Sequence, residues 1–243
     1  MSGYRERMEL LRILSPGDLA ALALFCALWL GYGPIVRALG PRAINAGLGE
    51  VRGRWMRAMV ARDNRIVDSA LIGHVMHSAS FFASTSLLAV GALVGLLTSL
   101  DRLEPALALF GGGGAPRALV ELKVLLPTVV LAHGVFLLTW ALRQMNYIVA
   151  LIGAVPAPPV AGGEALAEAM AGVLSSALTT FNSGIRSYYF ALAALTWMAG
   201  PVVLAVVSAL LMVVLLHRQR FSDVSRQFAR ARAALEQAHG HGG

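Results

Sequence analysis

The 243-residue sequence is poor in cysteine, in lysine and in charged residues as a whole. Its single cysteine, Cys26, lies inside an apolar run, so an internal disulfide and a cysteine-based zinc or iron–sulfur site are excluded. Charged residues make up 14% of the chain, against about 25% in soluble domains. Because 57% of the residues are hydrophobic, this composition indicates a membrane protein rather than a soluble one.

Motifs for common enzyme chemistries are also missing. The sequence has no glycine-rich phosphate loop, no His-Glu-x-x-His motif and no acidic cluster for magnesium. Glu121 and Lys123 stand at i and i+2, so they cannot face each other on a helix. The sequence therefore predicts no catalytic residue and favours a protein that is not an enzyme.

Arginine supplies almost all of the positive charge. Of the 20 basic residues 19 are arginine, and the formal net charge is +7. On a membrane protein such a balance predicts contact with anionic lipid head groups. The basic stretches are not interleaved with stacking aromatic residues, so we expect no nucleic-acid partner.

Long uncharged runs predict an all-α polytopic membrane protein with four transmembrane helices. The longest run, between Asp68 and Asp101, has 32 uncharged residues. As a helix it would extend about 48 Å, beyond the ~30 Å hydrocarbon core. We therefore expect it to continue without a break into an arginine-rich stalk. The predicted spans are about 18–37, 69–100, 119–142 and 188–216, with the stalk at 50–68.

The remaining segments complete one membrane domain, 17–216, between an amino-terminal segment, 1–16, and a tail, 217–243. Apolar residues from Leu166 to Ile185 recur on one helical face, so 163–186 is predicted as an amphipathic helix. It would lie on the membrane surface or pack against the stalk, on the same face as the helical extensions. A fifth span is the weaker alternative, because the polar face of this helix is continuous. The arginine-rich tail is predicted as a basic amphipathic helix.

Four spans would place both chain ends on one side of the membrane. Ten arginines then fall on the side of the chain ends and nine on the other, so the positive-inside rule is nearly tied. The arginines that flank the first span break this tie. They favour a cytoplasmic location for 38–68 and 143–189.

Two histidines inside predicted spans, His77 and His133, lie at similar depths, about 14 Å from the same surface. Matched depth is what a bis-histidine haem or a two-ligand metal site requires. A structural, hydrogen-bonding role is the more common use of intramembrane histidine. We therefore expect no cofactor, and a haem- or metal-binding redox protein is the alternative.

Small residues recur at four-residue spacing in the second predicted span. Such positions let helices approach closely. The predicted helix-packing positions are Ser80, Ser84, Gly91 and Gly95.

Four stretches of the sequence resemble a known family. They are RWMR (54–57) with RDNRIVD (62–68), SFFAST (80–85), LRQMNY (142–147), and FN (181–182) with Gly184, Arg186 and YYF (188–190). Together they resemble the bacterial membrane proteins of the domain of unknown function 599 family, over about residues 17 to 221. The resemblance implies a multi-pass protein of the bacterial cytoplasmic (inner) membrane, and it implies no chemistry.

Polar residues within these stretches stand where predicted helices leave the membrane on one side. Unpaired charges there are costly, so we expect an interhelical hydrogen-bond and salt-bridge network rather than a substrate or ion site. The predicted network comprises Asp63, Asn64, Arg65, Asp68, Arg143, Asn146, Tyr147, Asn182 and Arg186.

The function we favour is a non-catalytic scaffold, an accessory subunit or an oligomeric pore-type component, because the mid-membrane layer is nearly all apolar. Its partners would be the lipid bilayer and a homo-oligomer or larger membrane complex. A lipid enzyme acting at the membrane boundary through Asp63, Asp68 and Arg143 is a further alternative.

Overall fold

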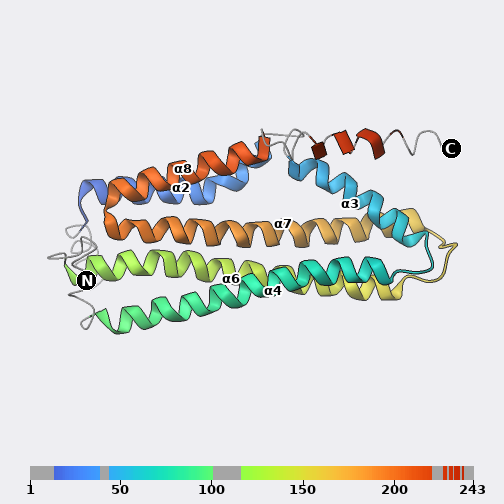
Figure 1. Ribbon diagram of the computed structural model, residues 1–243, viewed down its shortest axis with the longest axis horizontal. Helices are drawn as coiled ribbons and strands as arrows, with labels where there is room; N and C mark the ends of the chain where they lie inside the picture. Colours follow the sequence, from blue (N-terminus) through green and yellow to red (C-terminus); the bar gives the residue numbers. More distant parts are fainter. Residues whose placement is uncertain are drawn as a thin grey trace, which may run out of the picture. The chain divides into compact units, whose positions relative to one another are not determined.

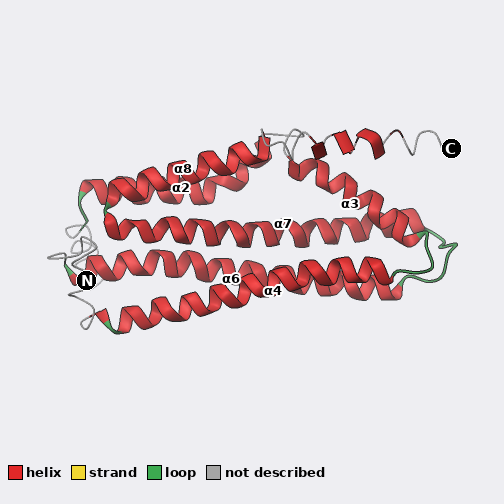
Figure 2. Ribbon diagram, in the orientation of Figure 1, coloured by secondary structure: helices red, strands yellow, loops and turns green. Residues whose placement is uncertain are grey.

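The computed structural model describes residues 14–38, 44–100 and 116–220, and scattered positions between 227 and 237. These residues form helices and no strand (Figures 1 and 2). The elements are α2 (Pro16–Ala38), α3 (Ile44–Val60), α4 (Ile66–Thr98), α6 (Arg117–Ala154), α7 (Gly163–Leu195), a 3-10 turn (Thr196–Ala199) and α8 (Pro201–Arg220). Most of the predicted tail lies outside the described residues.

Four of these helices are long and apolar enough to cross a membrane, which confirms the predicted fold class. The candidate spans are Pro16–Val36, Ile66–Thr98, Arg117–Ala154 and Pro201–Gln219. The first three overlap the predicted spans, and α6 extends beyond residue 142, to Ala154.

The predicted stalk is not continuous with the second span, because the chain breaks between Val60 and Ile66. Asn64 Oδ1 accepts a hydrogen bond from the Ile66 N–H at 3.0 Å, which begins α4. The Arg65 guanidinium donates to the carbonyl oxygens of Met59 and Val60, at the end of α3. These contacts stabilise a turn where the sequence pattern predicted uninterrupted helix.

The predicted amphipathic helix and fourth span divide at a different place as well. α7 runs through both, from Gly163 to Leu195, and α8 begins only at Pro201. Gly200 has a φ of 123°, a backbone conformation that residues with a side chain rarely adopt. Pro201 has no N–H to continue the helix. The break is therefore a full reversal of the chain (Figure 1) rather than a kink within one span.

The chain forms two compact units. Unit 1 comprises 1–33, 83–136 and 184–213, and unit 2 comprises 34–82, 137–183 and 214–243. In unit 1 the Phe25 and Phe190 rings meet edge-on at 5.9 Å, and both side chains are fully buried. α6 and α7 approach each other closely at Gly134, where an added Cβ would lie 3.3 Å from the Gly184 carbonyl oxygen.

The core of unit 2 joins four helices. Its buried residues include Met56 and Met59 of α3, Ile72 of α4, Ile148 of α6 and Met170 of α7. The apolar face of the predicted amphipathic segment 163–186 thus packs against α3. Packing against the former stalk region, one of the placements that the sequence left open, is therefore observed for this part of α7.

Candidate functional site

Arg65 is the best connected residue of the predicted polar network. Its Nη1 and Nη2 atoms donate to the carbonyl oxygens of Val155 and Pro156 at 2.6 and 2.8 Å. Nε and Nη2 also donate to those of Met59 and Val60 at 3.3 and 3.5 Å. One guanidinium thereby joins the end of α3 to the turn that follows α6. All three guanidinium nitrogens of Arg65, which could otherwise bind a ligand, are therefore engaged in contacts that hold the chain together.

Asp68 is a buried carboxylate, with 1% of its surface exposed. Its Oδ1 accepts a hydrogen bond from the Trp55 indole at 2.7 Å, and Arg62 Nη1 lies 3.6 Å from Oδ2. Oδ2 has no hydrogen-bond partner among the described residues. Asp68 stands in the first turn of α4, where the helix dipole stabilises negative charge. These contacts tie α3 to α4.

Unit 1 contains a second pair of this kind that the sequence analysis did not find. Trp197 is fully buried, and its indole donates to Asp18 Oδ1 at 2.8 Å. Asp18 also accepts from the Ser15 backbone N–H and hydroxyl, while Ser15 Oγ accepts from the Asp18 N–H at 3.1 Å. The Ser-Pro-Gly-Asp pattern of residues 15–18 is a local signal for the start of a helix. Trp197 is also bound to Asp18 of this pattern. This indole partner, 179 positions away, had no local signal.

The other predicted network residues make separate contacts. Arg143 donates to the Tyr147 hydroxyl at 2.9 Å along one face of α6. In unit 1 the Arg186 guanidinium stacks over the Tyr32 ring, 4.6 Å from its centroid. Asp63, Asn146 and Asn182 are exposed. No hydrogen bond or ion pair among described residues joins Arg143 to Asp63 or Asp68, the three residues of the lipid-enzyme alternative.

The two candidate haem ligands fall in different units and are exposed. His77 lies on α4 in unit 2, and His133 lies on α6 in unit 1. The His133 ring meets Trp29 edge-on at 5.5 Å. Within the described part of the chain, no group of three or more His, Cys, Asp or Glu residues is placed to hold a metal ion.

The predicted helix-packing positions lie on an exposed face of α4. Ser80, Ser84, Gly91 and Gly95 are all exposed, and a Cβ added at either glycine would meet nothing within 4 Å. The close helix approach lies instead at Gly134 with Gly184. Sequence spacing within one helix could not identify that pair, since the two glycines belong to different helices.

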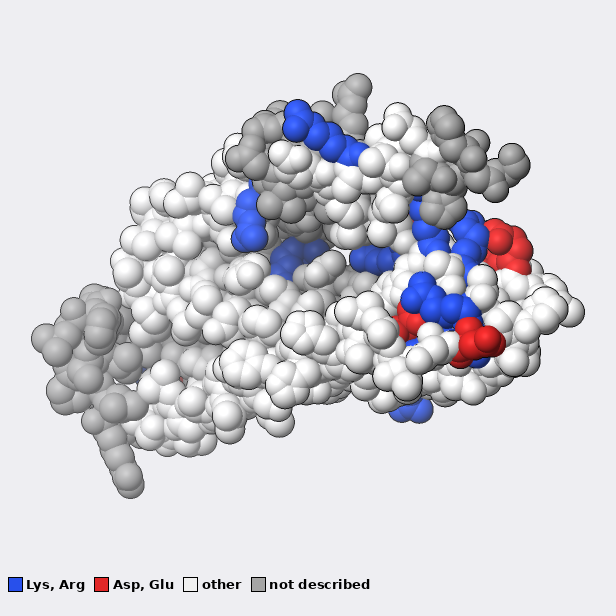
Figure 3. All heavy atoms as spheres, turned by 45° about the vertical axis from the view of Figure 1, so that its right-hand side comes forward, with Lys and Arg blue, Asp and Glu red and all other residues white. Residues whose placement is uncertain are grey.

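Unit 2 has an open groove between α3 and α7, bridged by Arg57 and Glu164 at 3.0 Å. Two cavities of about 500 and 380 Å³ share these two lining residues. The larger is also lined by Gly49, Gly53 and Glu168. Figure 3 shows basic and acidic side chains next to one another, on a face that is otherwise largely uncharged.

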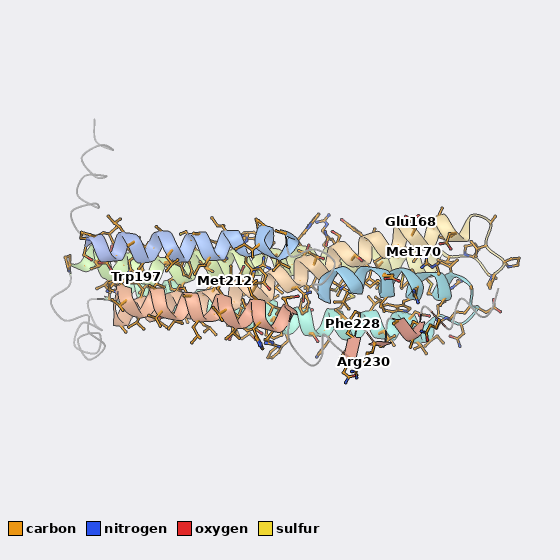
Figure 4. All side chains as sticks on the ribbon, turned by 90° about the horizontal axis from the view of Figure 1, so that it is seen from above. Glu168, Met170, Trp197, Met212, Phe228 and Arg230 are labelled. Atoms are coloured by element: carbon orange, nitrogen blue, oxygen red, sulfur yellow. The ribbon has the colours of Figure 1, made fainter. Side chains whose placement is uncertain are left out.

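Two residues of α7 that are two positions apart lie on different sides of the helix, one at the groove and one in the core. Met170 is fully buried, whereas Glu168 is exposed (Figure 4). Glu168 has no ion-pair or hydrogen-bond partner among the described residues. On α3, Arg52 is half-buried, and burial lowers its pKa because desolvation disfavours the charged form. The groove thus contains one carboxylate without an ion-pair partner, that of Glu168, and two glycines, Gly49 and Gly53.

Comparison with known proteins yields a family and no activity. A family model described as "Protein of unknown function, DUF599" matches residues 20–224. Neither the curated proteins nor the solved structures contain a match to this chain.

Proposed function

The chain belongs to this DUF599 family of unknown function, and we propose that it is a self-associating, non-catalytic scaffold of the bacterial cytoplasmic membrane. Four helices that can span a membrane support its place in the bilayer. The observation that carries the proposed function is the groove between α3 and α7. It is the open, mixed-charge surface of a unit whose best-connected polar side chains, those of Arg65 and Asp68, are engaged in structural contacts.

A second copy of the chain is the occupant that the groove suits. In an isologous dimer the same patch lies on both subunits and must be complementary to itself. The groove carries Arg57, which pairs with Glu164 of its own chain, and an unpaired Glu168. A guanidinium has five N–H donors, so Arg57 of each copy can also face Glu168 of the other. Gly49 and Gly53 leave open space on α3, which lets a helix approach closely.

Anionic lipids are the second proposed partner. The stretch from Arg52 to Arg65 contains five arginines. Each basic residue near an anionic surface contributes ~1 kcal/mol of attraction, which salt weakens. This attraction would hold the scaffold against the cytoplasmic leaflet.

A charge-swap experiment tests the proposed dimer. Glu168→Arg places like charges in both symmetry-related contacts, as does Arg57→Glu. We expect each variant alone to dimerise about 30-fold more weakly than the native protein, from ~1 kcal/mol lost per contact. An equal mixture of the two variants restores opposite charges in both contacts. We expect that mixture to form a heterodimer of near-native affinity, measured by light scattering and native mass spectrometry in lipid nanodiscs.

The matched control is Asp63→Arg, an equal charge change at an exposed position of unit 2 outside the groove. It should leave the native dimer unchanged. A native protein that stays monomeric would contradict self-association and leave the groove to a different protein. Failure of the mixed variants to pair would contradict the groove as the interface.

A further inference from the structure

Three helices of unit 1 begin at the same end. The Trp197 indole, just before α8, donates to Asp18 in the first turn of α2. Gly17 lies beside Pro201, with 3.7 Å between its added Cβ and Pro201 Cγ. The buried Lys123, near the start of α6, is close enough to interact electrostatically with Asp18. α2, α6 and α8 therefore all start near Asp18 and run away from it.

The end of α7 runs in the opposite direction. Gly134 of α6 contacts Gly184 and Ser187 of α7. Gly134 lies 11 residues beyond Lys123 on α6, and Trp197 lies 13 residues beyond Gly184. At ~1.5 Å per residue these are similar distances of ~16–20 Å, so this part of α7 is antiparallel to α6 and returns to the Asp18 end. Figure 1 shows α7 turning there into α8.

We infer that residues 184–199 are a fifth membrane-crossing segment, and that the exposed apolar side chains of unit 1, such as Leu88, Phe136 and Val202, contact lipid hydrocarbon. α6 and α8 run the same way, so a chain that crosses in both must return between them. The returning segment has 16 residues in unit 1, about 24 Å of helix, with Arg186 near its start. α7 continues without a break before residue 184, which supplies the remaining length of the ~30 Å hydrocarbon core. Arg186 covers the Tyr32 ring near the end of α2, a depth at which arginine reaches the interface.

Polar residues within α7 interrupt its hydrophobicity close to this segment. Asn182, Arg186 and Ser187 lie in the last 18 residues of the helix, so α7 lacks the long apolar stretch that α2, α4, α6 and α8 contain. Five crossings place the two chain ends on opposite sides of the membrane, in contrast to the four-span expectation.

An odd number of crossings also resolves the direction of insertion. The amino-terminal segment and the 101–117 segment then carry five arginines on one side, and the remaining 14 arginines fall on the other. The positive-inside rule assigns the side with 14 to the cytoplasm. The carboxyl end and the 155–162 turn face the cytoplasm, and the amino end faces outward.

Cysteine labelling tests this topology. In a Cys26→Ala background, single cysteines are placed by Ser2→Cys, Ala161→Cys and Gly242→Cys and treated with a membrane-impermeant maleimide. We expect Ser2→Cys to react in intact spheroplasts, and the other two to react only after permeabilisation. The Cys26→Ala protein without added cysteine gives the background.

The four-span arrangement predicts a different pattern, in which Ser2→Cys and Gly242→Cys react alike and Ala161→Cys differs. That pattern, or equal labelling of any position from both sides, would overturn the inference. A fluorescent protein fused after Gly243 gives a second readout without substitution. It should fluoresce, since such fusions fold in the cytoplasm, and a dark fusion on a normally inserted chain would also overturn the inference.

Discussion

Arg65→Ala should lower the free energy of unfolding by about 3–4 kcal/mol. The side chain makes two short charged hydrogen bonds, to Val155 and Pro156, and two longer ones to Met59 and Val60. Hydrogen bonds to charged groups contribute about 1.5–3 kcal/mol each, and the long pair contributes little. The substitution also leaves the Val155 carbonyl oxygen, on a buried residue, without its guanidinium donor.

Denaturant titration in mixed micelles measures this loss, and limited proteolysis locates it. The new cleavage sites should lie in the 61–65 and 155–162 turns that Arg65 joins. Arg65→Lys keeps the charge but has no planar fork, so it should recover less than half of the loss. Arg143→Ala is the control, because Arg143 is exposed and its bond is to Tyr147 one turn away. Equal effects at 65 and 143 would contradict the structural role of Arg65.

Trp197→Phe should destabilise the protein by about 3 kcal/mol. The indole is fully buried and donates to Asp18, which is 6% exposed. Phenylalanine removes that donor from a buried carboxylate and leaves a cavity where the second ring was. Because Asp18 and Trp197 both lie in unit 1, we expect unit 1 to lose stability and the protein to unfold at a lower denaturant concentration.

Trp140→Phe is the matched control, since Trp140 is 49% exposed on α6. It should change stability by less than about 0.5 kcal/mol. Trp55→Phe should fall between the two, because it removes the donor to buried Asp68 from a less buried ring. A Trp197→Phe protein as stable as Trp140→Phe would show that the indole bond to Asp18 contributes nothing.

The spans were predictable because bilayer insertion is decided by composition over about 20 residues. Ile66–Thr98 follows the uncharged run 69–100 closely, and Arg117–Ala154 contains the predicted span 119–142 and extends beyond it. The helix start at Ser15 has a local signal too, since capping involves neighbours within one turn. The family was recognisable too, because its motifs are local strings of residues.

The breaks and the partners were not predictable in the same way. The turn at 61–65 contains no glycine or proline, and it is held by Arg65 contacts to residues 90 and 91 positions away. The indole partners of Asp18 and Asp68 are likewise set by packing between helices. The Gly200-Pro201 break, in contrast to the turn at 61–65, had a local signal, but that signal does not distinguish a kink from a reversal.

The visible absorption spectrum of the purified protein, with metal analysis of the same sample, tests the non-catalytic scaffold most directly. The proposed non-catalytic function predicts a colourless, metal-free protein. A Soret band that disappears in both His77→Ala and His133→Ala would contradict the scaffold and establish the redox alternative.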